Sequence, residues 1–250
     1  MPRPLTHAAA IALALGFCAD ASADIVYPNL FGNDVAYVNI SEDKGLFGAP
    51  LVTGNSLVFT PSAFEVQAED GAVELLDGTV EFTVYAEGQF PLSTITIQES
   101  GAYNFVGRGA TEDTFASVSL LGSVVFLEAG GRSLSQGTQP AVFTIPFLVT
   151  DATEDDNGPL INAWRGSATI DLQALAEDAG FDADTASRIN GAAFVINNQL
   201  VASSEDGTIA FVDKKTLGAM VVTVVPEPAT AGIAAAGLLG LSLRRRNRRG

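Results

Sequence analysis

Hydrophobic and polar residues alternate along much of the chain. In Thr79–Glu87 the even-numbered positions are apolar and the odd-numbered positions, Tyr85 among them, are mostly polar or charged. Successive side chains of a strand point to opposite faces, so this pattern predicts a strand with one buried and one solvated face. Ala141–Val149 alternates in the same way. Its Pro146 lacks an N–H donor, which predicts an edge strand or a bulge there.

The same period of two marks further segments, separated by glycine-containing turns. The other predicted strands are Val35–Ile40, Leu57–Ala68, Ser93–Gln98, Ala116–Leu127, Gly166–Ile170, Ala192–Ile196, Thr208–Val212 and Ala219–Val225. The predicted turns are Glu69-Asp70-Gly71, Asp77-Gly78, Glu99-Ser100-Gly101, Gly130-Gly131 and Asp206-Gly207.

One segment has helical spacing instead. Apolar residues recur at i, i+3, i+4 and i+7 from Leu172, after Asp171 as a predicted N-cap and before Gly180 as a stop. A second short turn is expected from Thr185 to Asn190. We therefore expect a mainly β domain at residues 24–225. Its predicted fold is an antiparallel β-sandwich with one short helical insert, and a jelly roll is one form of it.

The first 23 residues have the features of a secretory signal peptide. Ala8–Phe17 is an uninterrupted apolar run, too short to span a bilayer unaided. Ala21 and Ala23 are the small residues that signal peptidase requires, which predicts cleavage before Asp24. The pattern therefore predicts export through the Sec translocon. A buried N-terminal helix is the alternative interpretation.

Three different patterns follow one another at the C-terminal end. Pro226-Glu227-Pro228 is followed by the uncharged segment 229–243 and by the basic residues Arg244, Arg245, Arg246, Arg248 and Arg249. As a helix, the uncharged segment would extend about 22 Å, and snorkelling arginines would help it reach across a hydrocarbon core of ~30 Å. The sequence thus predicts a single C-terminal transmembrane helix. The arginines are expected in the cytoplasm and the N-terminus outside.

This order of parts resembles the PEP-CTERM sorting signal of Gram-negative bacteria, over residues 226–249. The resemblance implies that an exosortase, a membrane-embedded cysteine peptidase, recognises Pro226, Glu227 and Pro228 as a substrate motif. It further implies a transient inner-membrane anchor, followed by placement at the cell surface or in an extracellular polysaccharide matrix. A permanent single-span anchor is the alternative.

Composition narrows the chemistry that the ectodomain can perform. The single cysteine, Cys18, and the single histidine, His7, both precede the predicted cleavage site. The mature chain would therefore lack thiolate and imidazole groups for catalysis or zinc binding. Of 29 acidic and 13 basic residues, 27 and seven lie within residues 24–225, which gives this segment a net charge of −20. Such a surface repels nucleic acid.

An acidic loop follows the strand that contains Pro146. Its oxygen-bearing side chains include Asp151, Asp155 and Asn157, which are candidate ligands for Ca²⁺. The spacing does not fit an EF-hand, because Trp164 stands where a bidentate glutamate belongs. A solvated acidic loop is the simpler interpretation.

Two aromatic residues, Trp164 and Tyr85, are candidate ligand-binding residues for extracellular polysaccharide, although Trp164 also fits a core or hinge position. A glycosidase would need a defined pair of carboxylates, and the sequence singles out none. We expect no catalytic residues and no cofactor other than Ca²⁺. The leading hypothesis is a non-enzymatic exported surface or matrix protein. The alternative is a carbohydrate-binding module on the same anchor, and a glycosidase ranks below it.

Overall fold

The computed structural model describes residues 24–88, 90–107, 110–134, 140–153, 161–215 and 218–227. These residues form two antiparallel sheets, which confirms the prediction of a mainly antiparallel β fold. Several predicted site residues lie outside the described ranges: Ala21, Ala23, Asp155, Asn157, Pro228, Arg244, Arg245, Arg246, Arg248 and Arg249.

The first sheet has the order β1-β3-β7-β13-β9-β10, with β2 beside β3 and β11 beside β9. Its strands are β1 (Ile25–Val26), β2 (Leu30–Phe31), β3 (Val35–Glu42), β7 (Val73–Ala86), β9 (Phe115–Ala129), β10 (Arg132–Ser133), β11 (Ala141–Asp151) and β13 (Ile189–Ser203).

The second sheet has the order β4-β5-β15-β8-β14-β6, with β12 beside β8. Its strands are β4 (Leu51–Thr53), β5 (Ser56–Phe59), β6 (Glu65–Glu69), β8 (Leu92–Val106), β12 (Asn162–Asp171), β14 (Ile209–Asp213) and β15 (Met220–Pro226). β8 pairs with β12 along one edge, and with β15 and then β14 along the other.

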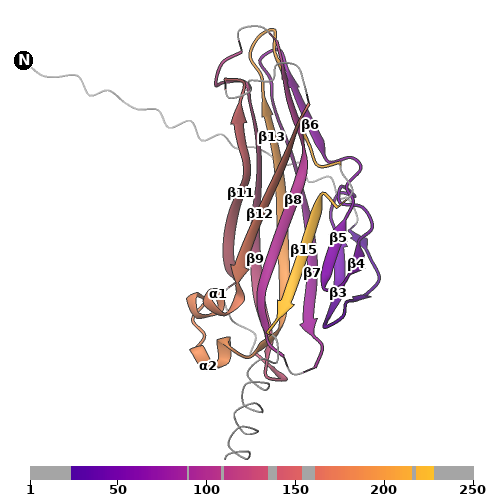
Figure 1. Ribbon diagram of the computed structural model, residues 1–250, viewed down its shortest axis with the longest axis vertical. Helices are drawn as coiled ribbons and strands as arrows, with labels where there is room; N and C mark the ends of the chain where they lie inside the picture. Colours follow the sequence, from indigo (N-terminus) through magenta and orange to yellow (C-terminus); the bar gives the residue numbers. More distant parts are fainter. Residues whose placement is uncertain are drawn as a thin grey trace, which may run out of the picture.

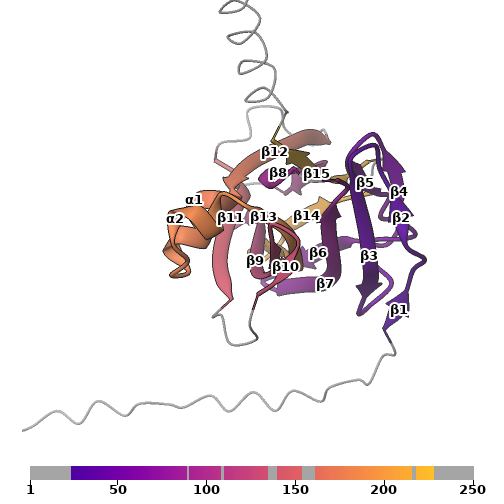
Figure 2. The same ribbon diagram turned by 90° about the horizontal axis from the view of Figure 1, so that it is seen from below.

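The long strands run along the long axis of the molecule (Figure 1). Viewed from one end, β12, β8 and β15 form one layer, and β11, β9, β13 and β7 curve beneath them (Figure 2). The core lies between the layers and is rich in phenylalanine. Phe82 on β7 and Phe194 on β13 stack with ring centroids 5.3 Å apart, and both are buried. Burial of each such side chain contributes about 2–3 kcal/mol.

The structure has two short helices where the sequence analysis predicted one helical insert. α1 (Leu172–Asp178) begins as predicted, because the Asp171 carboxylate accepts a hydrogen bond from the Ala174 N–H. α2 (Ala183–Ala186) begins before the predicted turn, because Asp182 caps it in the same way. Both helices lie beside β11 at one end of the molecule (Figure 1).

Two predicted turns are wrong. Asp77-Gly78 lies inside β7, and Glu99-Ser100-Gly101 lies inside β8. Gly78 continues the strand because Leu46 and Phe47 cover it, and an added Cβ would lie 3.0 Å from Leu46 Cδ1. The predicted strand Leu57–Ala68 is also wrong, because it divides into β5 and β6.

Pro146 behaves as its missing N–H requires. Within the part of the chain that the structure describes, β11 pairs with β9 alone, and the register shifts between Pro146 and Leu148. Edge position and bulge are therefore both confirmed.

Candidate functional site

The start of the proline-glutamate-proline motif is part of the folded body. Pro226 is the last residue of β15 and lies opposite Leu92 of β8, after a register shift at Val225. The next residue, Glu227, donates its backbone N–H to the carbonyl oxygen of Pro91 over 2.9 Å. Because proline has no N–H, the regular ladder ends at this point. The motif thus begins at a fixed position on the end of the second sheet.

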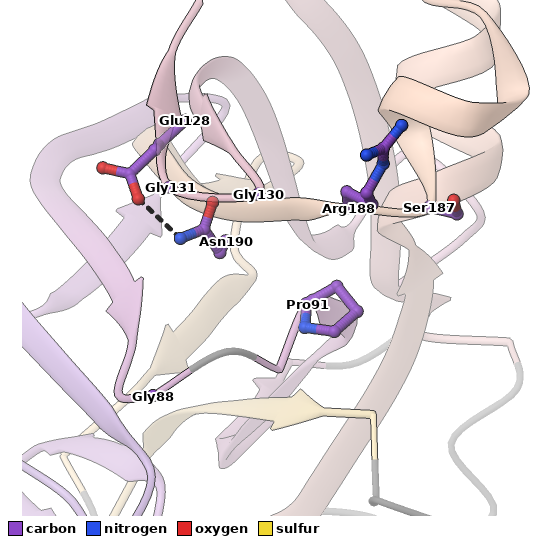
Figure 3. Close-up of a pocket in the computed structure, with 8 residues that line it drawn as sticks. All are labelled: Gly88, Pro91, Glu128, Gly130, Gly131, Ser187, Arg188 and Asn190. Carbon is purple, nitrogen blue, oxygen red and sulfur yellow. Dashed lines mark hydrogen bonds between the residues drawn. The ribbon is translucent and has the colours of Figure 1, made fainter. Parts of the chain in front are cut away.

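A pocket of about 570 Å³ lies at the same end of the molecule. It is lined by Gly88, Pro91, Glu128, Gly130, Gly131, Ser187, Arg188 and Asn190. Figure 3 shows Glu128, Asn190, Pro91 and Arg188 around the hollow. Pro91 is thus shared between the pocket and the hydrogen bond that holds Glu227.

Hydrogen bonds organise the polar side chains of this pocket. The Asn190 amide donates to Glu128 Oε1 over 2.6 Å, and Asn190 Oδ1 is buried without a partner. The Arg188 side chain pairs with Asp184 and keeps 57% of its surface exposed. Among the described residues that line the pocket, Glu128 is the one carboxylate.

The two aromatic candidates for ligand binding, Trp164 and Tyr85, differ in how far the structure buries them. Trp164 is 5% exposed, and its indole N–H donates to the Asp213 carbonyl oxygen over 3.2 Å. Trp164 is therefore a core residue without a free ring face. Tyr85 is half-buried and lies opposite Gly191 across the β7–β13 ladder. An added Cβ at Gly191 would lie 2.7 Å from the Tyr85 ring, so this ring covers the glycine.

Asp151, the first candidate calcium ligand, ends β11. Its carboxylate accepts hydrogen bonds from the N–H and the hydroxyl of Thr153, over 2.8 and 2.5 Å. Within the described ranges, no group of three or more acidic, histidine or cysteine side chains could hold a metal ion. The other two candidates lie outside those ranges, so the Ca²⁺ site stays a prediction.

A polar cluster that the sequence analysis missed lies in the core between the sheets. It consists of Glu99 on β8, Asn198 on β13 and Lys214 directly after β14. The Lys214 amine lies 2.5 Å from Glu99 Oε2 and 2.5 Å from Asn198 Oδ1. The Lys214 and Glu99 side chains are 1% and 0% exposed. We call these three residues the buried triad.

Aromatic rings and backbone contacts enclose the buried triad. Lys214 Nζ lies 5.3 Å from the centroid of the Phe64 ring and 6.0 Å from that of Trp164. Burial raises the pKa of the Glu99 carboxyl and lowers the pKa of the Lys214 amine. Both shifts disfavour the charged forms. Glu99 Oε1 has no hydrogen-bond partner, which is unusual for a buried oxygen.

Comparison with known proteins places one family model on this chain. The model of the PEP-CTERM protein-sorting motif matches residues 224–246 and so includes Pro226, Glu227 and Pro228. No curated protein matches the chain. Among the residues that the structure describes, no helix has the length and apolar character needed to cross a membrane.

Three of the solved structures that align with this chain do so at low identity and low TM-score. TmCBM61 in complex with β-1,4-galactotriose is 8% identical, over 76% of this chain and 88% of that one, with a TM-score of 0.26. A family 12 xyloglucanase from Bacillus licheniformis is 9% identical, over 82% and 100%, with a TM-score of 0.23. The mannan-binding module TmCBM27 is 13% identical, over 81% and 95%, with a TM-score of 0.20. At these scores the similarity supports no functional conclusion.

Proposed function

We propose that this chain is a non-enzymatic protein of the cell surface or extracellular matrix. The proposal starts from the PEP-CTERM sorting motif that the chain carries, which targets it to an exosortase for export. One observation supports this proposal most directly. The folded body begins just after the predicted N-terminal signal and ends on the first residue of the C-terminal motif, because β1 begins at Ile25 and β15 ends at Pro226.

The proposed route begins at the N-terminal end. The Sec translocon exports the chain, and signal peptidase cleaves between Ala23 and Asp24. Ile25 and Val26 of β1 pair with Glu42 and Ser41 of β3. The body therefore begins within two residues of the proposed cut, and cleavage removes no described strand.

The route ends at the C-terminal motif. We place segment 229–243 in the membrane as a helix, with the arginines that follow in the cytoplasm. We propose that the ectodomain, which lies outside the membrane, is a jelly-roll-like β-sandwich. Because Glu227 is hydrogen-bonded to Pro91, the motif starts directly at the body without a flexible spacer. Exosortase would then act close to the end of the molecule that carries the pocket.

The test replaces Pro226 and Pro228 together by alanine in the full chain, in a Gram-negative host with an active exosortase. The matched control is Pro140→Ala, an exposed proline just before β11. We expect the double variant to stay full-length in the membrane fraction, and the control to lose its arginine-rich end as wild type does. Intact mass and fractionation measure both. Release of the double variant at the wild-type level would refute recognition of this motif.

A second candidate function, binding of extracellular polysaccharide, rests on the pocket at the motif end. Its volume of about 570 Å³ lies in the usual range for small-ligand sites, and its polar groups suit hydroxyl recognition. A glycan array with wild type and Arg188→Ala tests it. Binding that the substitution weakens would support this role, and no binding to any glycan would remove it.

A further inference from the structure

The buried triad combines the three groups needed to form an amide between two side chains. We propose that the Lys214 amine attacks the Asn198 side-chain amide and forms a Lys214–Asn198 isopeptide bond, with Glu99 as the proton-transfer group. This inference is independent of the sorting motif and of the pocket.

The geometry brings the reacting atoms close together. Lys214 Nζ lies 2.5 Å from Asn198 Oδ1. Because a carbonyl bond is about 1.2 Å long, Asn198 Cγ lies at most about 3.7 Å from the amine nitrogen. Attack distances in reactive ground states are about 3–3.5 Å. A small rotation of the asparagine side chain would therefore bring the carbon into reach.

The environment supplies a nucleophilic amine. An ammonium ion cannot attack a carbonyl carbon, because its nitrogen has no free electron pair. Burial lowers the pKa of the Lys214 amine and raises the pKa of the Glu99 carboxyl, and both shifts favour the neutral forms that the attack requires. In the proposed reactive form, one proton has moved across the 2.5 Å contact from the amine to the carboxyl, which leaves both groups neutral. Glu99 Oε1, which has no partner, remains free to exchange protons.

The reaction balances without any oxidant or co-reactant. The lone pair of Lys214 Nζ forms a bond to Asn198 Cγ, while Glu99 donates its proton to the carbonyl oxygen and accepts one from the amine. The Cγ–Nδ2 bond then breaks, and Nδ2 leaves as ammonia with the proton that Glu99 returns. The hydroxyl oxygen gives its proton back to Glu99 as the carbonyl group re-forms. One primary amide and one amine become one secondary amide and one ammonia, and Glu99 ends as it began.

The surrounding residues hold the lysine in place. Its backbone N–H donates to the Phe64 carbonyl oxygen over 2.9 Å. The preceding carbonyl, of Asp213, accepts from the Trp164 indole, and the Asp213 carboxylate accepts from the Ala102 N–H over 2.9 Å. The Phe64 and Trp164 rings exclude water from the product amide. This arrangement fixes the lysine before the reaction, which is how proximity accelerates amide formation.

The test is peptide mass spectrometry of the full chain, purified folded from the producing cell. Between Arg188 and Lys214 the chain has no other site for trypsin, so Asn198 and Lys214 fall in one tryptic peptide. We expect this peptide to be lighter by one ammonia, uncut after Lys214, and without backbone fragments between residues 198 and 214. Cleavage after Glu205 should then leave two peptides still joined.

Single substitutions test the role of each residue of the buried triad in the proposed reaction. Lys214→Arg, Asn198→Ala and Glu99→Gln should each give the unlinked peptide at full mass. The neighbouring Lys215→Arg is the matched control and should keep the link, because Lys215 lies outside the core and pairs with Glu65.

Two results would overturn the proposal, and both come from the wild-type chain, so they hold even if a variant fails to fold. The first is a full-mass peptide cut after Lys214. The second is a peptide that lacks ammonia but is still cut after Lys214, which would show cyclisation of Asn198 alone.

Discussion

Replacing Gly101 by alanine tests how closely β8 approaches the segment that contains the buried lysine. A Cβ at this position would lie 1.8 Å from the Asp213 carbonyl oxygen and 2.8 Å from Trp164 Nε1. The first of these atoms belongs to the backbone, so no side-chain rotation relieves the contact. The residue 213 backbone must move by more than 1 Å to reach van der Waals distance.

The expected cost has two parts. Overpacking a well-packed site costs about 1–3 kcal/mol. The same movement breaks the hydrogen bond from the Trp164 indole to the Asp213 carbonyl, which contributes about 1 kcal/mol. We therefore expect Gly101→Ala to lower the free energy of unfolding by about 2–4 kcal/mol. It should also reduce the amount of linked peptide, because Lys214 follows Asp213 directly.

Urea unfolding followed by tryptophan fluorescence measures this effect. Trp164 is the single tryptophan of the chain, so its emission reports this site alone. The control is Gly207→Ala, which has a φ of +76° and nothing within 4 Å of an added Cβ. That control should cost only the ~1–2 kcal/mol of a left-handed backbone. Equal losses for the two variants, with unchanged emission in Gly101→Ala, would refute the reasoning.

Three further outcomes follow from the structure. Phe82→Ala removes a buried ring stacked on its neighbour and should cost about 3–5 kcal/mol in urea unfolding; a loss below ~1 kcal/mol would contradict its place in the core. The hydrogen bond from Lys44 lowers the pKa of Asp77, so Asp77→Asn should be destabilising at neutral pH, modestly because the pair is exposed. Since the folded-state pKa lies below 3.8, this difference should vanish as the pH falls through and below that value; a pH-independent difference would count against the pair. If the loop after Asp151 binds Ca²⁺, millimolar Ca²⁺ should raise the melting temperature of the chain, and an unchanged temperature would dispose of the site.

The strands that alternate cleanly could be predicted from the sequence. The predicted strand Thr79–Glu87 is confirmed as far as Ala86, where β7 ends, and Asp171 caps α1 as predicted. These features depend on neighbouring residues along the chain, which is why a single sequence reveals them. Pro146 belongs to the same group, because its missing N–H acts on its own strand.

The buried triad could not be predicted, because it depends on contacts across the core. Glu99 belongs to the sequence Glu-Ser-Gly, which is typical of a turn, and Gly101 supports that interpretation. In the structure this glycine is needed because Asp213 comes close to β8, and the glutamate is buried because Lys214 faces it. The sequence offered one indication of an unusual lysine. Basic residues are scarce in the ectodomain, yet two of them, Lys214 and Lys215, are adjacent.

The position of β15 has a consequence for the order of events during export. Although it is the final strand in the chain, it lies between β5 and β8 in the interior of the second sheet. In a chain that emerges N-terminus first, the edges of β5 and β8 that face β15 therefore stay unpaired until nearly the last ectodomain residue has crossed. The residues that complete the sheet immediately precede the peptidase motif. Completion of folding and arrival of the motif at the enzyme are thus nearly simultaneous, so a body that fails to close would reach the peptidase with β15 unpaired.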